Sequence, residues 1–158
     1  MAGVAVYSTG IEPEWIDYNG HLRDAYYGLI VSLGIDALMD RLGLDQSYRT
    51  RTGCTLYTLE MHIHYLREIK STARVRAEVR ILGADRKRIH AAFDLVSEGD
   101  TEPAATAEVM LMHVRQTPDV TSQPFGPETA VAIDALRQST ASLPPARHGS
   151  RQMQLPQR

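Results

Sequence analysis

The sequence predicts an α+β domain in which an antiparallel sheet wraps around one long helix. Apolar residues recur every three or four positions from residue 26 to 42, which is the spacing of one helical stripe. From residue 55 the apolar spacing changes to two, the period of half-buried strands. The connections between the alternating segments are short, whereas parallel strands need a crossover of a dozen or more residues. We therefore expect these strands to be antiparallel.

Composition excludes several classes of protein. The 158 residues have the length of one domain with a real core, and 43% apolar with 23% charged residues is typical of a globular protein. The 17 basic and 19 acidic residues give a net charge of −2, which offers no basic surface for nucleic acid. Cys54 is the single cysteine, and the first seven residues carry no basic region or long apolar run. We expect a cytoplasmic protein without signal peptide or membrane span.

The first elements are a strand and the long helix. Residues 4–11 are short, apolar and partly β-branched, which predicts a strand that Pro13 ends. Within the helix, Gly34 is expected to mark a bend and Gly43 to cap the C-terminus. The stripe predicted to face the sheet consists of Tyr26, Leu29, Ile30, Leu33, Ala37, Leu38 and Leu42.

Four strands follow, at residues 55–65, 73–81, 88–95 and 104–115, and their short connections predict a four-stranded meander. The apolar face of the first is expected to consist of Thr55, Tyr57, Leu59, Met61, Ile63 and Tyr65.

The end of the chain changes character after one further element. Residues 127–138 begin with a proline and predict a terminal helix. Residues 139–158 are rich in Ser, Pro, Arg and Gln without periodicity, which predicts a disordered tail. The predicted domain is therefore residues 1–138.

The loop before the long helix carries the candidate catalytic group. Asp17 is followed three residues later by Gly20, which tolerates a tight bend and the close approach of a ligand. Asp24 is expected to cap the helix, whose unpaired N–H groups would polarise a carbonyl beside Asp17. The alternative is that Asp17 only satisfies a turn, because an isolated Asp-x-x-Gly motif is short.

This element order, together with Asp17, Gly20, Asp24 and Tyr27, resembles the hotdog fold of acyl-CoA thioesterases of the 4-hydroxybenzoyl-CoA thioesterase type, over about residues 12–114. In that family the matching acid is the catalytic carboxylate. The segments that resemble, more closely, the betainyl-CoA thioesterases of carnitine degradation are 14–21, 59–63 with Tyr65 and Leu66, 83–90, and Met112 with His113.

The resemblance implies hydrolysis of a small acyl-CoA thioester, most closely betainyl-CoA, to the free acid and coenzyme A. It implies a homodimer or homotetramer with sites between protomers, and no dissociable cofactor. Asp17 would attack the thioester carbon or act as general base on water, and the sequence leaves both open. The N–H groups around Gly20 to Asp24 would hold the thioester oxygen, with His21 assisting.

Further candidates would bind the substrate. A quaternary ammonium cannot donate hydrogen bonds, so aromatic faces suit it. The aromatic candidates are Trp15, Tyr18, Tyr26 and Tyr27, whereas Tyr57 and Tyr65 are expected to be core residues. Asp24 or Glu60 would balance the positive charge.

Other polar candidates have simple structural alternatives. Glu60 and His62 share the polar face of one strand, where the alternative is a solvated or interface-paired face, and without a third ligand they predict no metal site. Arg86 and Arg88, at a strand turn, would meet the coenzyme A phosphates, unless they serve solubility alone.

Three rival functions remain. The first is a thioesterase for another short or aromatic acyl-CoA. The second is a hydratase acting on an enoyl thioester, which the position of Asp17 ahead of the helix disfavours. The third rival is a non-catalytic module that binds acyl-CoA or a quaternary amine and would not need Asp17.

Overall fold

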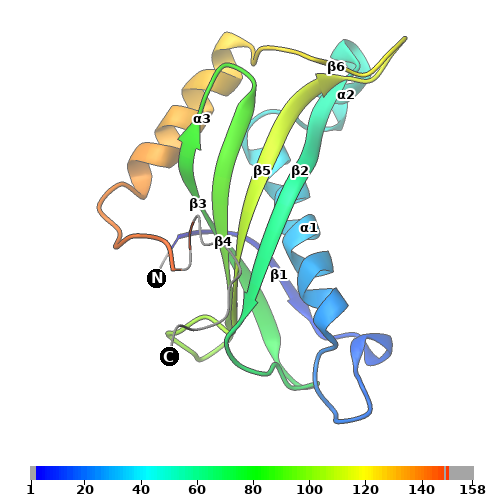
Figure 1. Cartoon of the computed structure of the whole chain (residues 1–158), viewed down its shortest axis with the longest axis vertical. Helices are drawn as coiled ribbons and strands as arrows, with labels where there is room; N and C mark the ends of the chain where they lie inside the picture. Colours follow the sequence, from blue (N-terminus) through cyan, green and yellow to red (C-terminus); the bar gives the residue numbers. More distant parts are fainter. Residues whose placement is uncertain (1–2, 148, 150–158) are drawn as a thin grey trace, which may run out of the picture.

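The computed structural model describes residues 3–147 and 149 of the chain. Its elements are β1 (Val4–Gly10), the 3-10 turn η1 (Pro13–Trp15), α1 (Asp24–Arg41), α2 (Gln46–Thr52), β2 (Cys54–Tyr65), β3 (Arg74–Ala84), β4 (Arg88–Ser97), β5 (Ala105–Arg115), β6 (Thr121–Ser122) and α3 (Pro127–Ser139). One antiparallel sheet has the order β1-β3-β4-β5-β2, with β6 paired to β5. The sheet curves past α1, and α3 lies along β3 (Figure 1). The predicted hotdog arrangement is thus confirmed.

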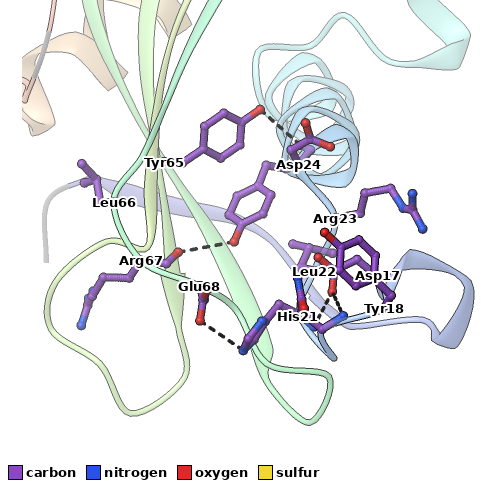
Figure 2. A pocket seen from close by; sticks show the side chains of 12 residues that line it. Asp17, Tyr18, His21, Leu22, Arg23, Asp24, Tyr65, Leu66, Arg67 and Glu68 are labelled. Carbon is purple, nitrogen blue, oxygen red and sulfur yellow. Dashed lines mark hydrogen bonds and ion pairs between the residues drawn. The ribbon is translucent and has the colours of Figure 1, made fainter.

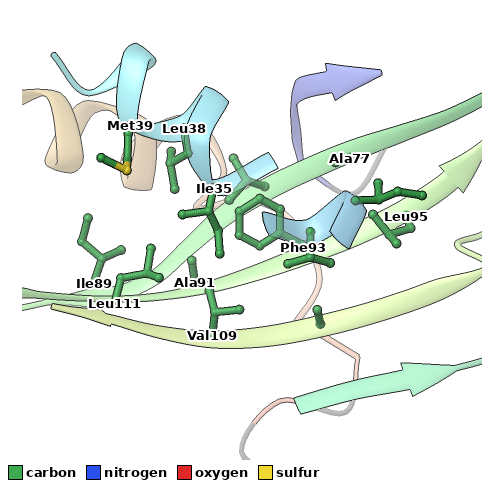
Figure 3. Close-up of a cluster of buried hydrophobic side chains, with 14 of the residues drawn as sticks. Ile35, Leu38, Met39, Ala77, Ile89, Ala91, Phe93, Leu95, Val109 and Leu111 are labelled. Atoms are coloured by element: carbon green, nitrogen blue, oxygen red, sulfur yellow. The ribbon is translucent and has the colours of Figure 1, made fainter. Parts of the chain in front are cut away.

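The face of α1 that packs on the sheet differs from the predicted stripe. Leu29 is 38% exposed, and Leu33 and Ala37 are only half-buried. Figure 3 shows Ile35, Leu38 and Met39 with the side chains of the sheet. The helix is apolar around much of its circumference, so spacing alone could not select the line that faces the sheet. The residues of α1 that are buried are Tyr27, Ile30, Val31, Gly34, Ile35, Leu38 and Met39.

The three special positions predicted for α1 had different outcomes. Gly43 has φ +75° directly after the last turn, as expected of a C-terminal cap. Gly34 marks no bend; it makes room for Phe93, whose Cε1 would lie 3.1 Å from an added Cβ. Asp24 is not the N-cap, which is Arg23, because Asp24 is already helical and its carboxylate accepts the N–H of Ala25 (2.8 Å).

The predicted four-stranded meander is wrong. Only β3, β4 and β5 form a meander, and β2 pairs with β5 at the far edge of the sheet. Residues 66–73 carry the chain across the end of the sheet from β2 to β3. Eight extended residues reach about 26 Å, whereas three inter-strand steps cover about 14 Å. A short connection therefore did not require the two strands to be neighbours.

A bulge in β2 reverses its apolar face. The register shifts between Thr58 and Glu60, so Leu59 is an additional residue. Before the bulge Leu56 is buried, and after it Met61 and Ile63 pack on the core. The predicted apolar face is therefore wrong in its first half, where Tyr57 (37%) and Leu59 (53%) are exposed.

The remaining elements include one surprise. The predicted terminal helix is confirmed as α3, but the short α2 was not predicted; Asp45 caps it by accepting the N–H of Tyr48 (2.8 Å). In the segment predicted as a tail, Thr140 is buried and the carbonyl of Pro144 accepts from Arg80. The rest of that prediction concerns residues 148 and 150–158, which lie outside the described residues.

Candidate active site

Asp17 lies in a closed loop between η1 and α1. Its N–H donates to the carbonyl of His21 (2.9 Å), and its own carbonyl accepts the N–H of Gly20 (3.1 Å). Gly20 has φ +82°, a conformation that disfavours a side chain. Leu22 donates its N–H to the carbonyl of Ile69 (2.8 Å), which joins the loop to the chain after β2. The backbone thus holds Asp17 in one place.

The backbone also stabilises the ionised form of Asp17. Its Oδ1 accepts the N–H groups of Asn19 (2.8 Å) and His21 (3.1 Å). These bonds, that of His21 first, hold the pKa of the carboxyl below its usual value. No hydrogen bond to Oδ2 occurs within residues 3–147, so this oxygen is available to a substrate or water. A nucleophile or general base requires this ionised form.

A cavity of about 540 Å³ opens beside Asp17, between its loop and the segment after β2 (Figure 2). Five of the predicted site residues, from the loop and from α1, line this cavity: Asp17, Tyr18, His21, Asp24 and Tyr27. The lining residues are Asp17, Tyr18, Asn19, His21, Leu22, Arg23, Asp24, Tyr27, Tyr65, Leu66, Arg67 and Glu68.

Two tyrosines line the cavity on the side of α1 and β2. The ring of Tyr27 meets that of Tyr65 edge to face, with centroids 5.1 Å apart. Tyr27 donates its hydroxyl to the carbonyl of Arg67 (3.4 Å), and Tyr65 donates to the carbonyl of Asp24 (3.3 Å). Burial raises the pKa of both phenols, so both stay neutral. Tyr65, expected in the core, is 54% exposed and presents its ring to the cavity.

The structure reduces the predicted set of oxyanion donors to a single N–H group. The N–H groups of residues 20–23 already donate, to Asp17, to Ile69 and to Trp15. Within the part of the chain that is described, the N–H of Asp24 makes no hydrogen bond. It lies at the first turn of α1, where the helix dipole is positive, and is therefore suited to a developing oxyanion.

Two of the predicted cage residues, Trp15 and Tyr26, lie outside the cavity. The ring of Trp15 stacks on that of Tyr26, with centroids 5.5 Å apart and planes inclined by 18°. This contact leaves no space between the rings for a trimethylammonium group, and neither residue lines the cavity. Tyr18 does line it but is 94% exposed. The geometry gives Trp15 and Tyr26 a supporting role beside the loop.

The other predicted residues lie away from the cavity. His62 and Glu60 pair with each other on β2 (Nε2–Oε1 2.8 Å) and are exposed. Arg86 and Arg88 lie at the opposite end of the sheet from Tyr65. Arg88 pairs with Asp85 (Nη2–Oδ2 2.6 Å) and lowers the pKa of that carboxyl to about 2. No cluster of three metal-ligating side chains occurs among the described residues.

His113, one of the residues that carry the resemblance, is also remote from the cavity. It is 1% exposed, its Nε2 lies 3.0 Å from the Tyr48 hydroxyl, and its Nδ1 lies 2.9 Å from the carbonyl of Gln123. Since a carbonyl only accepts, Nδ1 carries a proton. His113 joins α2 and β5 to the segment before α3, which is a structural role.

Sequence reasoning missed the contribution of the segment after β2. Arg67 and Glu68 line the cavity although no motif singled them out. The only signal was their position directly after Tyr65 and Leu66, which belong to a block of resemblance. Their approach to Asp17 depends on the crossing from β2 to β3, which the sequence misassigned.

Fold and cavity define an acyl-CoA thioesterase of the hotdog type, and residues 11–146 match the thioesterase-like superfamily, to which the chain therefore belongs. It is a homologue of the betainyl-CoA thioesterase of Pseudomonas aeruginosa, with 43% identity over 141 residues that cover 89% of this chain and 88% of that protein. An L-carnitine dehydrogenase/betainyl-CoA thioesterase of Agrobacterium fabrum is 43% identical over 100 residues, 63% of this chain and 20% of that longer protein.

Two solved structures are similar over nearly the whole chain. A putative thioesterase from Pseudomonas putida KT2440 is 39% identical, with a TM-score of 0.85 and 99% of both chains covered. A hypothetical protein from Staphylococcus aureus, in complex with CoA, is 26% identical, with a TM-score of 0.86 and coverage of 99% of this chain and 98% of that one.

Proposed function

We propose that this protein hydrolyses betainyl-CoA to betaine and coenzyme A, with Asp17 as the catalytic carboxylate. The observation that carries the proposal is the Asp17 carboxyl, which lines the cavity, has a lowered pKa and keeps Oδ2 free of hydrogen bonds to residues 3–147. The 43% identity to a betainyl-CoA thioesterase supports the substrate.

The charges of the cavity favour a cationic acyl group. Asp17, Asp24 and Glu68 line it, opposed by Arg23. The side chain of Arg67 turns away, because its guanidinium pairs with Asp100 (3.7 Å) and donates to the carbonyl of Glu102. The excess of carboxylates suits a positive charge.

The aromatic side of the cavity suits the same group. A quaternary ammonium is attracted to the face of an aromatic ring, and Tyr65 supplies an exposed ring beside Asp24, packed edge to face against the buried Tyr27. Tyr27 is one of the expected cage residues, whereas Tyr65 was expected in the core.

Hydrolysis follows one of two routes at the same atoms. The thioester oxygen accepts the N–H of Asp24, which stabilises the charge that develops on it. In one route Asp17 attacks the carbonyl carbon, coenzyme A leaves as the thiolate, and water then hydrolyses the mixed anhydride. In the other, Asp17 takes a proton from water, which attacks the carbon directly and expels the same thiolate. Either route breaks one C–S bond and consumes one water.

We also propose that two copies pair through β2 to form the working dimer, alone or as half of a tetramer. Among the described strands β2 bonds only to β5, so its outer edge is open. Tyr57 and Leu59 add exposed apolar surface there. Antiparallel pairing across a two-fold axis would bring the partner's β4 to about 14 Å from the Tyr65 end of β2, three inter-strand steps away.

The dimer gives the remaining predicted residues a role. The turn that carries Arg86 and Arg88 would then lie near the opposite copy's cavity, where the phosphates of coenzyme A need cationic partners. Glu60 and His62 would lie at the interface. Location in the cytoplasm stays a prediction; no helix of the described residues is long and apolar enough to cross a membrane.

Release of free coenzyme A from betainyl-CoA, acetyl-CoA, a branched short-chain ester and an aromatic ester tests the activity. We expect the highest kcat/KM for betainyl-CoA and a loss on the order of 10³-fold in Asp17→Asn. Asp119→Asn, which removes an exposed turn carboxylate, is the matched control and should retain full activity. A preference for another ester would contradict betainyl-CoA as the substrate but would still support thioesterase activity.

The non-catalytic alternative has a distinct signature. A binding module would take up betainyl-CoA equally in the wild type and Asp17→Asn, and neither protein would release coenzyme A. Calorimetric titration of both proteins with a non-hydrolysable thioether analogue measures this binding directly.

A further inference from the structure

Glu68 lies on the cavity wall in a segment that is fixed relative to Asp17. The segment follows β2, and the Leu22 N–H bond to Ile69 joins it to the Asp17 loop (2.8 Å). This bond belongs to the antiparallel bridge that pairs His21 with Lys70. This backbone connection, directly after Glu68, holds the residue beside the cavity that Asp17 also lines.

The contacts of Glu68 leave its charge available. Its Oε2 lies 3.1 Å from Nε2 of His21, and Figure 2 shows the two side chains directed toward each other. This contact sets the direction of the Glu68 carboxylate. The Glu68 side chain is 74% exposed, which leaves it accessible to a ligand in the cavity.

The other acids of the cavity already have tasks. Asp17 is assigned to the reacting carbon, and its Oδ1 holds two N–H groups. Asp24 accepts the N–H of Ala25 at the start of α1, next to the cationic Arg23. Glu68 is the carboxylate of the cavity that neither reacts nor bonds to the helix.

The chemistry of the acyl group restricts where its counter-charge can be. In a betainyl thioester one methylene separates the quaternary nitrogen from the carbonyl carbon, so the cation lies close to the carbon at Asp17. Resting on the proposed function, we infer that Glu68 is a specificity-determining residue that selects a cationic acyl group over a neutral one of the same shape. The exposed ring of Tyr65 accepts the methyl groups, and the Glu68 carboxylate interacts with the positive charge.

A charge-deleted substrate tests the inference. In 3,3-dimethylbutanoyl-CoA a tert-butyl group replaces the trimethylammonium group without changing its shape. We expect the wild type to prefer betainyl-CoA, and Glu68→Gln to reduce the ratio of the two kcat/KM values about fivefold. Glu68→Asp should restore part of the preference. The wild-type ratio should also fall with added salt, and that of Glu68→Gln should change less.

Glu98→Gln is the matched control, because Glu98 is an exposed glutamate on the turn between β4 and β5, where it pairs with Arg74 (4.0 Å). In this variant the ratio of kcat/KM for betainyl-CoA to kcat/KM for 3,3-dimethylbutanoyl-CoA should equal that of the wild type. An unchanged ratio in Glu68→Gln would overturn the inference, and so would an equal loss for both esters, which would mark Glu68 as a positioning residue for the Asp17 loop. A wild type that hydrolyses neither ester refutes the proposed function itself.

Discussion

At the scale of the residue, backbone contacts hold the Asp17 carboxylate in the form that the proposed reaction requires. Within residues 3–147 no cationic side chain bonds to Asp17; two N–H groups of its own loop stabilise its negative charge. Such a site leaves the second oxygen uncovered for the substrate. A salt-bridged acid would have to break its ion pair before it reacted, which costs more than the loss of a water.

The pH dependence of hydrolysis follows from this loop. The folded-state pKa of Asp17 is lowered, so the ionised form persists below the ordinary value of 3.8, and its contribution to stability is lost only as the pH falls through the folded-state pKa. We expect kcat/KM to show no acid limb from Asp17 between about pH 5 and pH 8. Stopped-time assays of coenzyme A release across this range check it, with circular dichroism at each pH. An acid limb centred above about pH 5 in a folded protein would contradict the assignment.

At the scale of the element, α1 approaches the sheet closely because it carries glycine where the contact is tightest. An added Cβ on Gly34 would lie 3.1 Å from Cε1 of Phe93 and 3.3 Å from Cβ of Ala77. Phe93 is fully buried in the centre of the sheet and cannot move aside without displacing its neighbours. Close packing of α1 keeps Tyr27, one turn from Asp24, in its place at the cavity.

Two glycine variants of α1 separate packing from helix propensity. Gly34→Ala gains about 1 kcal/mol of helix propensity but loses about 2 kcal/mol or more by overpacking, so we expect a net destabilisation of about 1 kcal/mol. Gly28→Ala is the control, because an added Cβ on Gly28 would lie 3.6 Å from Cδ1 of Ile63, which is an ordinary contact distance. It should be neutral or stabilising. Urea unfolding measures the free energy of unfolding of both variants. Equal stability would show that the sheet shifts to accommodate the added Cβ at Gly34.

At the scale of the whole molecule, the open edge of β2 is the surface through which we propose that copies assemble. The strand exposes Tyr57 and Leu59 next to unpaired backbone groups, an arrangement that monomeric proteins usually avoid. The same edge ends at Tyr65, on the cavity wall. Assembly and the completion of the site are therefore linked in the proposed dimer.

A charge at the edge tests that link. Leu59→Lys should hinder edge pairing, shift the protein toward the monomer and reduce turnover of betainyl-CoA at least tenfold, because the coenzyme would lose the partner's basic turn. Light scattering coupled to size-exclusion chromatography measures the assembly. Val131→Lys places the same charge on α3, at a side chain that is 69% exposed, and should leave both properties unchanged. A fully dimeric and active Leu59→Lys protein would exclude the β2 edge as the interface.

Much of the protein is determined by the sequence alone, because the relevant physics is local. Hydrophobic period distinguishes helix from strand within a dozen residues, so α1, α3 and the principal strands were predicted close to their observed bounds. The turn chemistry of Gly20 and Gly43 depends on backbone conformation alone, and both have positive φ. The Asp17 loop is likewise built from bonds within five consecutive residues.

Only the tertiary structure decided the order of the strands and the composition of the cavity. The path of residues 66–73 across the sheet brings Arg67 to Tyr27, 40 positions away, and Glu68 to His21. The bulge at Leu59 reverses which side chains of β2 face the core. Neither feature has a local signature, because the bulge and the crossing are stabilised by pairing with β5 and by contacts with the Asp17 loop. Hydrophobic spacing cannot predict which distant residues meet through such pairing. The position of Glu68 at the cavity therefore became apparent only in the folded chain.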